Sequence, residues 1–95
     1  MRIKWLKEGL EMIPLDEELK KKIEKWAAEV DQEELEKLGE YEDTGDSIVC
    51  PLIDPYVEGG KVVKIVKHRG KYMVTAGIYE QGGYAEEYYI AVLFL

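Results

Sequence analysis

The sequence predicts an α+β domain in which N-terminal helices pack on a C-terminal four-stranded antiparallel β-meander. Apolar residues recur at helical spacing through the first forty positions, whereas residues from Gly45 onward form apolar runs separated by glycine-containing turns. The chain has 95 residues, 46% of them apolar, which is enough for one modest core and too little for two. We therefore expect a single domain, 1–95, with a helical part over 1–40 and a sheet over 45–95.

The first helix is expected to end at Pro14, because proline stops the preceding helical pattern. Four apolar residues share one helical face before it, at spacings of three, four and three: Ile3, Leu6, Leu10 and Ile13. Isoleucine and tryptophan also suit sheets, so a short strand over Arg2–Leu6 is the alternative. The pattern alone leaves residues 1–13 open between helix and strand.

Two further helices follow, each preceded by an aspartate that suits an N-cap. Asp16 is expected to cap a helix reaching Val30, with lysine and glutamate on its outer face. Its inner face is apolar at spacings of four, three and four: Leu19, Ile23, Trp26 and Val30. Asp31 followed by Glu34 resembles a capping box and predicts a short helix over Gln32–Leu38, with Gly39 as its C-cap.

Four strands are expected in the second half of the chain. They are Ser47–Ile53, Lys61–His68, Lys71–Glu80 and Tyr84–Phe94. Pro51 interrupts the first, which indicates an edge or a bulge. Arg69-Gly70 and Gly82-Gly83 are expected to be two-residue hairpin loops between the last three strands.

These loops imply a register that can be compared with a structure. Ile65 is then opposite Val74, Ala76 opposite Tyr89, and Gly77 opposite Tyr88. One face of the sheet becomes apolar, and we expect it to be the core face: Val63, Ile65, Tyr72, Val74, Ala76, Ile78, Tyr89, Ala91 and Leu93.

The opposite face of the predicted sheet is mixed. Its polar members are expected in water: Lys64, His68, Lys71 and Thr75. It also carries apolar side chains that a lone soluble domain rarely exposes together: Met73, Tyr88, Ile90, Val92 and Phe94. We expect this face to be covered by barrel closure or by a second chain, for instance in a homodimer formed through the sheet.

Three segments of this half have a strand–loop–hairpin rhythm that resembles small SH3-like barrels. They begin at Gly45 (Gly-Asp-Ser-Ile-Val), Gly60 (Gly-Lys-Val-Val-Lys-Ile-Val) and Gly70 (Gly-Lys-Tyr-Met-Val). A helix cradled by a curved antiparallel sheet, as in cystatin-like or NTF2-like folds, is a comparable analogy. Each resemblance implies a curled sheet and no functional residue.

The net charge of −7 is confined to one segment, Asp31–Asp46. Residues on either side balance in charge, whereas this segment holds a single lysine, Lys37, and eight acids: Asp31, Glu33, Glu34, Glu36, Glu40, Glu42, Asp43 and Asp46. A concentrated field of one sign can select a basic partner, although charge runs are often merely solvated surfaces. Five bases on the predicted hairpin form an opposite pole, which could hold an anion or pair with the acids internally or in a neighbouring copy: Lys61, Lys64, Lys67, Arg69 and Lys71.

The sequence carries no signature of catalysis, and we expect neither a metal nor another cofactor. One histidine, His68, and one cysteine, Cys50, cannot build a zinc site, and a lone cysteine fits a reducing, cytoplasmic compartment. The acidic balance argues against nucleic-acid binding, and no apolar run has the length of a membrane span. The N-terminus lacks the apolar stretch of a signal peptide.

The sequence thus favours a non-enzymatic protein-binding module, an inhibitor or adaptor whose acidic segment docks on a basic protein surface. An alternative is a small-molecule pocket between helix and curved sheet, lined by Trp26, Tyr72 and Tyr89. A third is a structural scaffold without a ligand, since the lysine–glutamate helix and glycine turns also suit a designed or thermophilic protein. Salt dependence separates the first two, because ionic strength weakens charge-driven docking.

Overall fold

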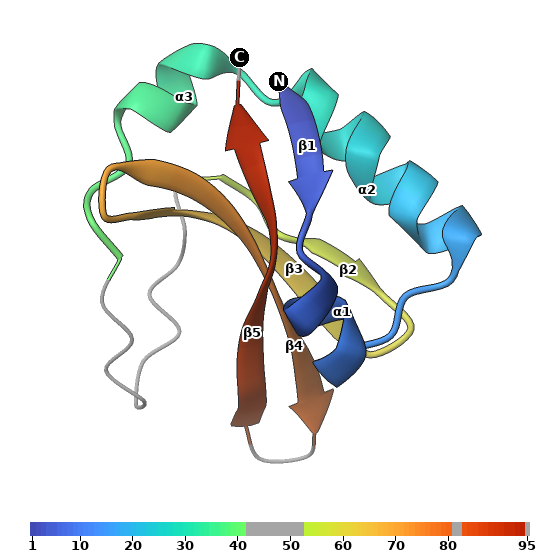
Figure 1. The fold of residues 1–95 in the computed structure, drawn as a ribbon. Coiled ribbons are helices and arrows are strands. Elements are labelled where there is room, and N and C mark those ends of the chain that lie inside the picture. Colours follow the sequence, from blue (N-terminus) through green and yellow to red (C-terminus); the bar gives the residue numbers. More distant parts are fainter. Residues whose placement is uncertain (42–52, 81–82, 95) are drawn as a thin grey trace.

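A computed structural model describes residues 1–41, 53–80 and 83–94 of the chain, and it has the expected α+β architecture (Figure 1). The helices are α1 (Lys7–Met12), α2 (Glu17–Glu29) and α3 (Gln32–Glu36). The strands are β1 (Arg2–Trp5), β2 (Tyr56–Glu58), β3 (Lys61–His68), β4 (Lys71–Glu80) and β5 (Gly83–Phe94). All pair antiparallel in the order β1-β5-β4-β3-β2, so the described strands form one curled, open sheet.

The N-terminal residues form a strand and then a short helix, so the expected single helix ending at Pro14 was wrong and the alternative, a short strand over Arg2–Leu6, is confirmed as β1. Ile3 pairs with Leu93 and Trp5 with Ala91, and the Leu6 amide then donates to the Ile90 carbonyl at 2.8 Å. Alternation explains the result, because Ile3 and Trp5 are half-buried while Arg2 and Lys4 are exposed. Pairing with β5 gives the backbone N–H and C=O groups of β1 hydrogen-bond partners, and Ile3 and Trp5 still pack against the core.

Helix α2 matches its prediction closely. The Asp16 carboxylate accepts a hydrogen bond of 2.7 Å from the Leu19 amide, which is the N-cap geometry. Ile23 and Ala27 are fully buried and join the core, with Leu19, Trp26 and Val30 packed around them. In Figure 1 this helix lies beside β1.

Replacing Asp16 with alanine is therefore expected to lower the free energy of unfolding by about 1 kcal/mol, because the Leu19 amide loses its acceptor. Urea denaturation followed by circular dichroism measures the change. Asp16→Asn, which keeps an acceptor oxygen, is the matched control and should recover most of the loss. Equal losses in the two variants would contradict a capping role.

Helix α3 begins as expected but ends early. Asp31 caps it by accepting from the Glu33 amide at 2.9 Å. The helix stops at Lys37, whose amide bonds to the carbonyls of Glu34 and Leu35, so the expected C-cap at Gly39 was wrong. The chain then turns to the sheet, where the backbone of Glu40 forms an isolated parallel β-bridge with that of Lys67. The Tyr41 amide donates to the Lys67 carbonyl at 2.7 Å. Pairing with β3 thus ends α3 before the glycine is reached.

The register between β3 and β4 is the predicted one, with Ile65 opposite Val74 and His68 opposite Lys71. The loop between them places Arg69 and Gly70 at φ 51° and 76°, the left-handed conformation that a two-residue hairpin turn requires.

Between β4 and β5 the predicted register holds from Tyr72 to Val74 and is wrong beyond. Thr75 lies opposite Tyr89, Ala76 opposite Tyr88, and Gly77 opposite Glu87, while Glu80 pairs with Gly83. Two bulges in β5 cause the shift. Ile90 and Glu86 have no residue opposite them on β4, so each moves the pairing by one position, and Glu86 has φ 55°. Such bulges bend a strand and move the following side chains to the other face.

The bulges change which aromatic residues reach the core. Tyr88 packs against it and Ile90 is fully buried in it, although both were expected on the opposite face. Tyr89, expected in the core, instead lies 4.9 Å from the His68 ring by centroid. Ile78, also expected inside, is 38% exposed. Tyr72 is half-buried against the core. The other predicted core positions on the strands are confirmed as buried: Val63, Ile65, Val74, Ala76, Ala91 and Leu93.

The sheet has five described strands where four were expected. Strands β1 and β2 extend it at its two edges. The predicted strand Ser47–Ile53 falls outside the described residues except for Ile53, which is buried. The face expected to need a cover is partly covered within this one chain, since Met73 is buried while Phe94 stays 42% exposed. The described strands do not close into a barrel, because β1 and β2 are the two edges of their sheet, and the homodimer stays a prediction.

Candidate functional site: the acidic helix and its pocket

The structure divides the predicted acidic site. Asp31 is occupied as the N-cap of α3, and the Glu40 carboxylate accepts a hydrogen bond from the Arg69 amide on the β3–β4 hairpin. Both acids therefore also hold the fold together. The acids at positions 42, 43 and 46 lie outside the described residues.

Three of the acids, Glu33, Glu34 and Glu36, are exposed on the single turn and a half of α3. None of them takes part in an ion pair between described residues. Leu35, at 2% exposure, anchors the same helix in the core. The buried leucine thus holds the helix in place while its carboxylates face water, as the sequence predicted for these three residues.

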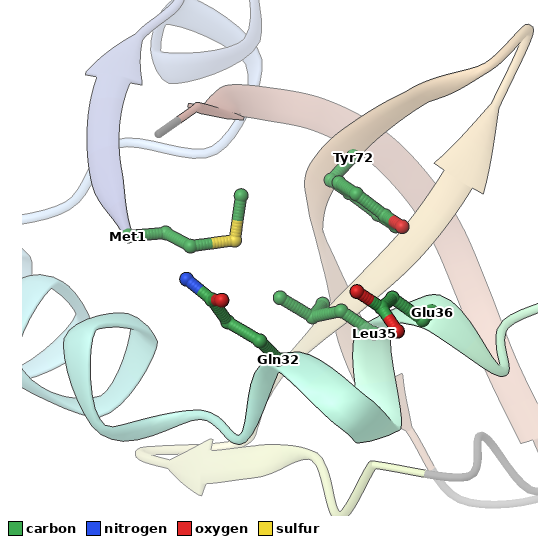
Figure 2. Close-up of a pocket in the computed structure, with 5 residues that line it drawn as sticks. All are labelled: Met1, Gln32, Leu35, Glu36 and Tyr72. Atoms are coloured by element: carbon green, nitrogen blue, oxygen red, sulfur yellow. The ribbon is translucent and has the colours of Figure 1, made fainter.

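A pocket of about 190 Å³ lies beside this helix. Met1, Gln32, Leu35, Glu36 and Tyr72 line it (Figure 2). In Figure 2 Met1 and Gln32 lie on one side, Tyr72 and Glu36 on the other, and Leu35 between them. The sheet explains the meeting of Met1 and Tyr72, because Ile3 of β1 and Tyr72 of β4 both pair with Leu93 of β5.

The pocket combines apolar walls with polar groups near its rim. Met1, Leu35 and Tyr72 pack on the core and supply the apolar surface. Glu36 and Gln32 are exposed and contribute a carboxylate and a carboxamide. This arrangement suits a cationic group carried on an apolar stem. Sequence reasoning missed Met1 and Gln32, because nothing local indicates that Met1 lies next to Tyr72.

The three aromatic residues of the alternative pocket do not converge. The Trp26 ring lies 6.1 Å from that of Tyr56, Tyr72 faces α3, and Tyr89 contacts His68. The bulge at Ile90 is the physical reason, because it places Tyr89 on the sheet face away from the helices. Tyr89 therefore does not lie with Trp26 and Tyr72 on the helix side of the sheet, and the small-molecule alternative stays a prediction.

A buried ion pair lies on that other face, where the sequence predicted solvated side chains. Lys64 Nζ is 3.1 Å from Glu87 Oε1, and the two side chains are 8% and 10% exposed. That contact does not have hydrogen-bond alignment, whereas the Tyr41 hydroxyl donates to Glu87 Oε2 at 2.7 Å. The Lys64 ammonium also lies 5.1 Å from the centre of the Tyr41 ring. Thr75, expected in water, is likewise buried.

Other bases of the predicted hairpin pole also make contacts in the fold. Lys61 donates to the Pro14 carbonyl at 3.1 Å, and the backbone amide of Arg69 is bound by Glu40. Glu40 of the acidic segment therefore contacts the hairpin through the backbone of Arg69, and side-chain pairing of the two charged poles stays a prediction. The bases of the hairpin do not reach Glu33, Glu34 or Glu36 in any ion pair between described residues.

A second polar pocket, of about 250 Å³, lies between the start of α2 and the β2–β3 turn. Lys22 and Glu58 form an ion pair there at 2.8 Å. The hydrogen bond from Lys22 lowers the pKa of the Glu58 carboxyl, and the same bond raises the pKa of Lys22. Desolvation and then Glu58 raise the pKa of Tyr56. Acids and lysines line this pocket together, so it does not select one sign of charge.

The described residues contain no group of three or more histidine, cysteine, aspartate or glutamate side chains placed to hold a metal ion. No helix in the described ranges is long and apolar enough to cross a membrane. No protein-family model, curated protein sequence or solved structure matches this chain.

Proposed function

We propose that the protein is a non-enzymatic binding module that docks on a basic segment of a partner protein through α3 and the residues that follow it. The observation that carries the proposal is the anchoring of α3. Buried Leu35 fixes a helix whose three carboxylates are exposed and make no ion pair with described residues, next to a pocket with apolar walls.

Fixed charges of this kind favour association in two ways. Uncompensated carboxylates raise the encounter rate of a basic partner, and an adjoining apolar surface slows its departure. A basic segment that brings both charge and aliphatic stems complements both parts of the surface. An inhibitor or an adaptor would use such a surface without performing a reaction.

Reversing all three exposed acids of α3 to lysine (Glu33→Lys, Glu34→Lys and Glu36→Lys) is expected to weaken binding of a basic peptide at least tenfold. The probe is a fluorescein-labelled peptide of alternating lysine and glycine, followed by fluorescence anisotropy at low salt. Binding by the unchanged protein should also fall as salt rises, because exposed charges more than about 8–10 Å apart are screened at physiological salt. Glu40 is left unchanged because it binds the Arg69 amide.

The matched control is a second triple variant with the same change in charge at three other glutamates: Glu8→Lys, Glu11→Lys and Glu29→Lys. These residues are exposed and take no part in ion pairs between described residues. Circular dichroism should show both triple variants folded, since surface substitutions usually change stability by within about 0.5 kcal/mol. Equal weakening by the two triple variants would mean that net charge, not α3, governs binding, and unchanged binding in the α3 variant would refute the proposal.

A further inference from the structure

We infer that the pocket beside α3 is a subsite for one arginine side chain of the basic partner. The inference rests on the proposed function and adds to it a specific residue in the ligand. Its occupant is chosen by the chemistry of the lining: a carboxylate at Glu36, a carboxamide at Gln32, an aromatic ring at Tyr72 and apolar walls from Met1 and Leu35.

The size of the pocket favours a single side chain over a free small molecule. Its volume is about 190 Å³. One water molecule in the liquid takes up about 30 Å³, so the space holds several heavy atoms. Pockets for free small molecules usually have volumes of roughly 300–1,000 Å³. A side chain brought in by a larger partner does not need to be enclosed on all sides.

The groups around the pocket match a guanidinium better than an ammonium. A guanidinium is planar, so it can stack on an aromatic ring and offer two parallel N–H donors to a carboxylate. Tyr72 and Glu36 lie on the same side of the pocket in Figure 2, and the carboxamide oxygen of Gln32 is a further acceptor across from them. The methylene stem of an arginine would contact Met1 and Leu35. A lysine offers the charge and the stem but no planar group.

Three labelled peptides that differ only at the centre test this inference. Each is a seven-residue peptide of alternating glycine and lysine with arginine, lysine or citrulline at its middle position. Citrulline keeps the shape of arginine and lacks its charge. The arginine peptide is expected to bind about three- to tenfold more tightly than the other two, the range set by a partly solvated charge-assisted contact plus ring stacking.

Glu36→Gln and Glu33→Gln form a matched pair of variants on the same helix. Both sites are exposed, and Glu36 lines the pocket whereas Glu33 does not. Glu36→Gln should remove most of the preference for the arginine peptide over the citrulline peptide. Glu33→Gln should weaken the binding of all three peptides slightly and equally. Tyr72→Phe should keep the preference for arginine over lysine, and Tyr72→Leu should lose it. Chemical shifts of the Met1 methyl group should move on adding the arginine peptide to the unchanged protein.

The outcomes separate this inference from the proposed function. The arginine subsite would be refuted if the three peptides bound equally or if the two glutamine variants had equal effects. Neither result would contradict docking on the acidic surface of α3. If none of the peptides bound the unchanged protein, the proposed function would fail and the subsite with it.

Discussion

Replacing Gly9 with alanine is expected to destabilise the protein by about 3 kcal/mol, near the upper end of what overpacking costs. In an exposed helix the same change stabilises by up to about 1 kcal/mol, so the sign itself is diagnostic. Gly9 is buried where α1 crosses β5, and a Cβ there would collide with the Tyr89 carbonyl oxygen. It would also lie 2.8 Å from the carbonyl carbon of Tyr89 and 2.9 Å from the Cα of Ile90.

Backbone atoms cannot move aside as a flexible side chain can, so α1 would have to lift from β5. The Leu6–Ile90 hydrogen bond lies in the same contact and would be strained with it. Thermal unfolding should show Tm lowered by roughly 10–20 °C, given the usual relation for a domain of this size. Gly39→Ala is the control, since nothing lies within 4 Å of a Cβ at that position. A variant of Gly9 as stable as the Gly39 variant would contradict the close approach of α1 and β5.

Breaking the buried ion pair is the second large effect expected. Lys64→Met leaves the Glu87 carboxylate buried without its cation, and Glu87→Leu removes the carboxylate that pairs with the Lys64 ammonium. Each single variant should lose about 3 kcal/mol or more of unfolding free energy, because removing one partner of a buried pair strands the other. The double variant should recover much of the loss, since an apolar pair carries no desolvation penalty.

A double-mutant cycle by urea denaturation measures this coupling. The pair Lys20–Glu17, at 2.8 Å, serves as the control, because its glutamate side chain is 82% exposed and its lysine side chain 22% exposed. Removing either of those partners should change stability by less than about 1 kcal/mol. Additive losses at Lys64 and Glu87 would show that the two charges do not depend on each other.

Locally encoded elements of this protein were predictable. The helix after Asp16 needs only a capping side chain and apolar residues every three or four positions, and both are visible in the sequence. The β3–β4 hairpin needs a two-residue turn and matching alternation on its two strands, and its register was predicted residue by residue. The exposure of Glu33, Glu34 and Glu36 followed from the same short-range reasoning.

The bulges in β5 were not predictable in this way. A strand of alternating residues is compatible with a straight register or a bulged one, and the choice depends on how β5 fits β4, α1 and β1 together. Ile90 is buried against α1 and the core only because the bulge turns it there. The same shift moves Tyr89 to the face that holds His68, where it cannot line a pocket with Trp26.

The sequence by itself determined the α+β class, the capped α2, the β3–β4 register and the charge that gathers after Asp31. Each of these depends on residues a few positions apart, whose geometry the chain imposes directly. Tertiary structure decided that residues 2–5 pair with β5, that Lys64 is buried against Glu87, and that Met1 meets Tyr72 beside α3. Those outcomes depend on the packing of segments far apart in the chain, where burial and backbone pairing outweigh local preference.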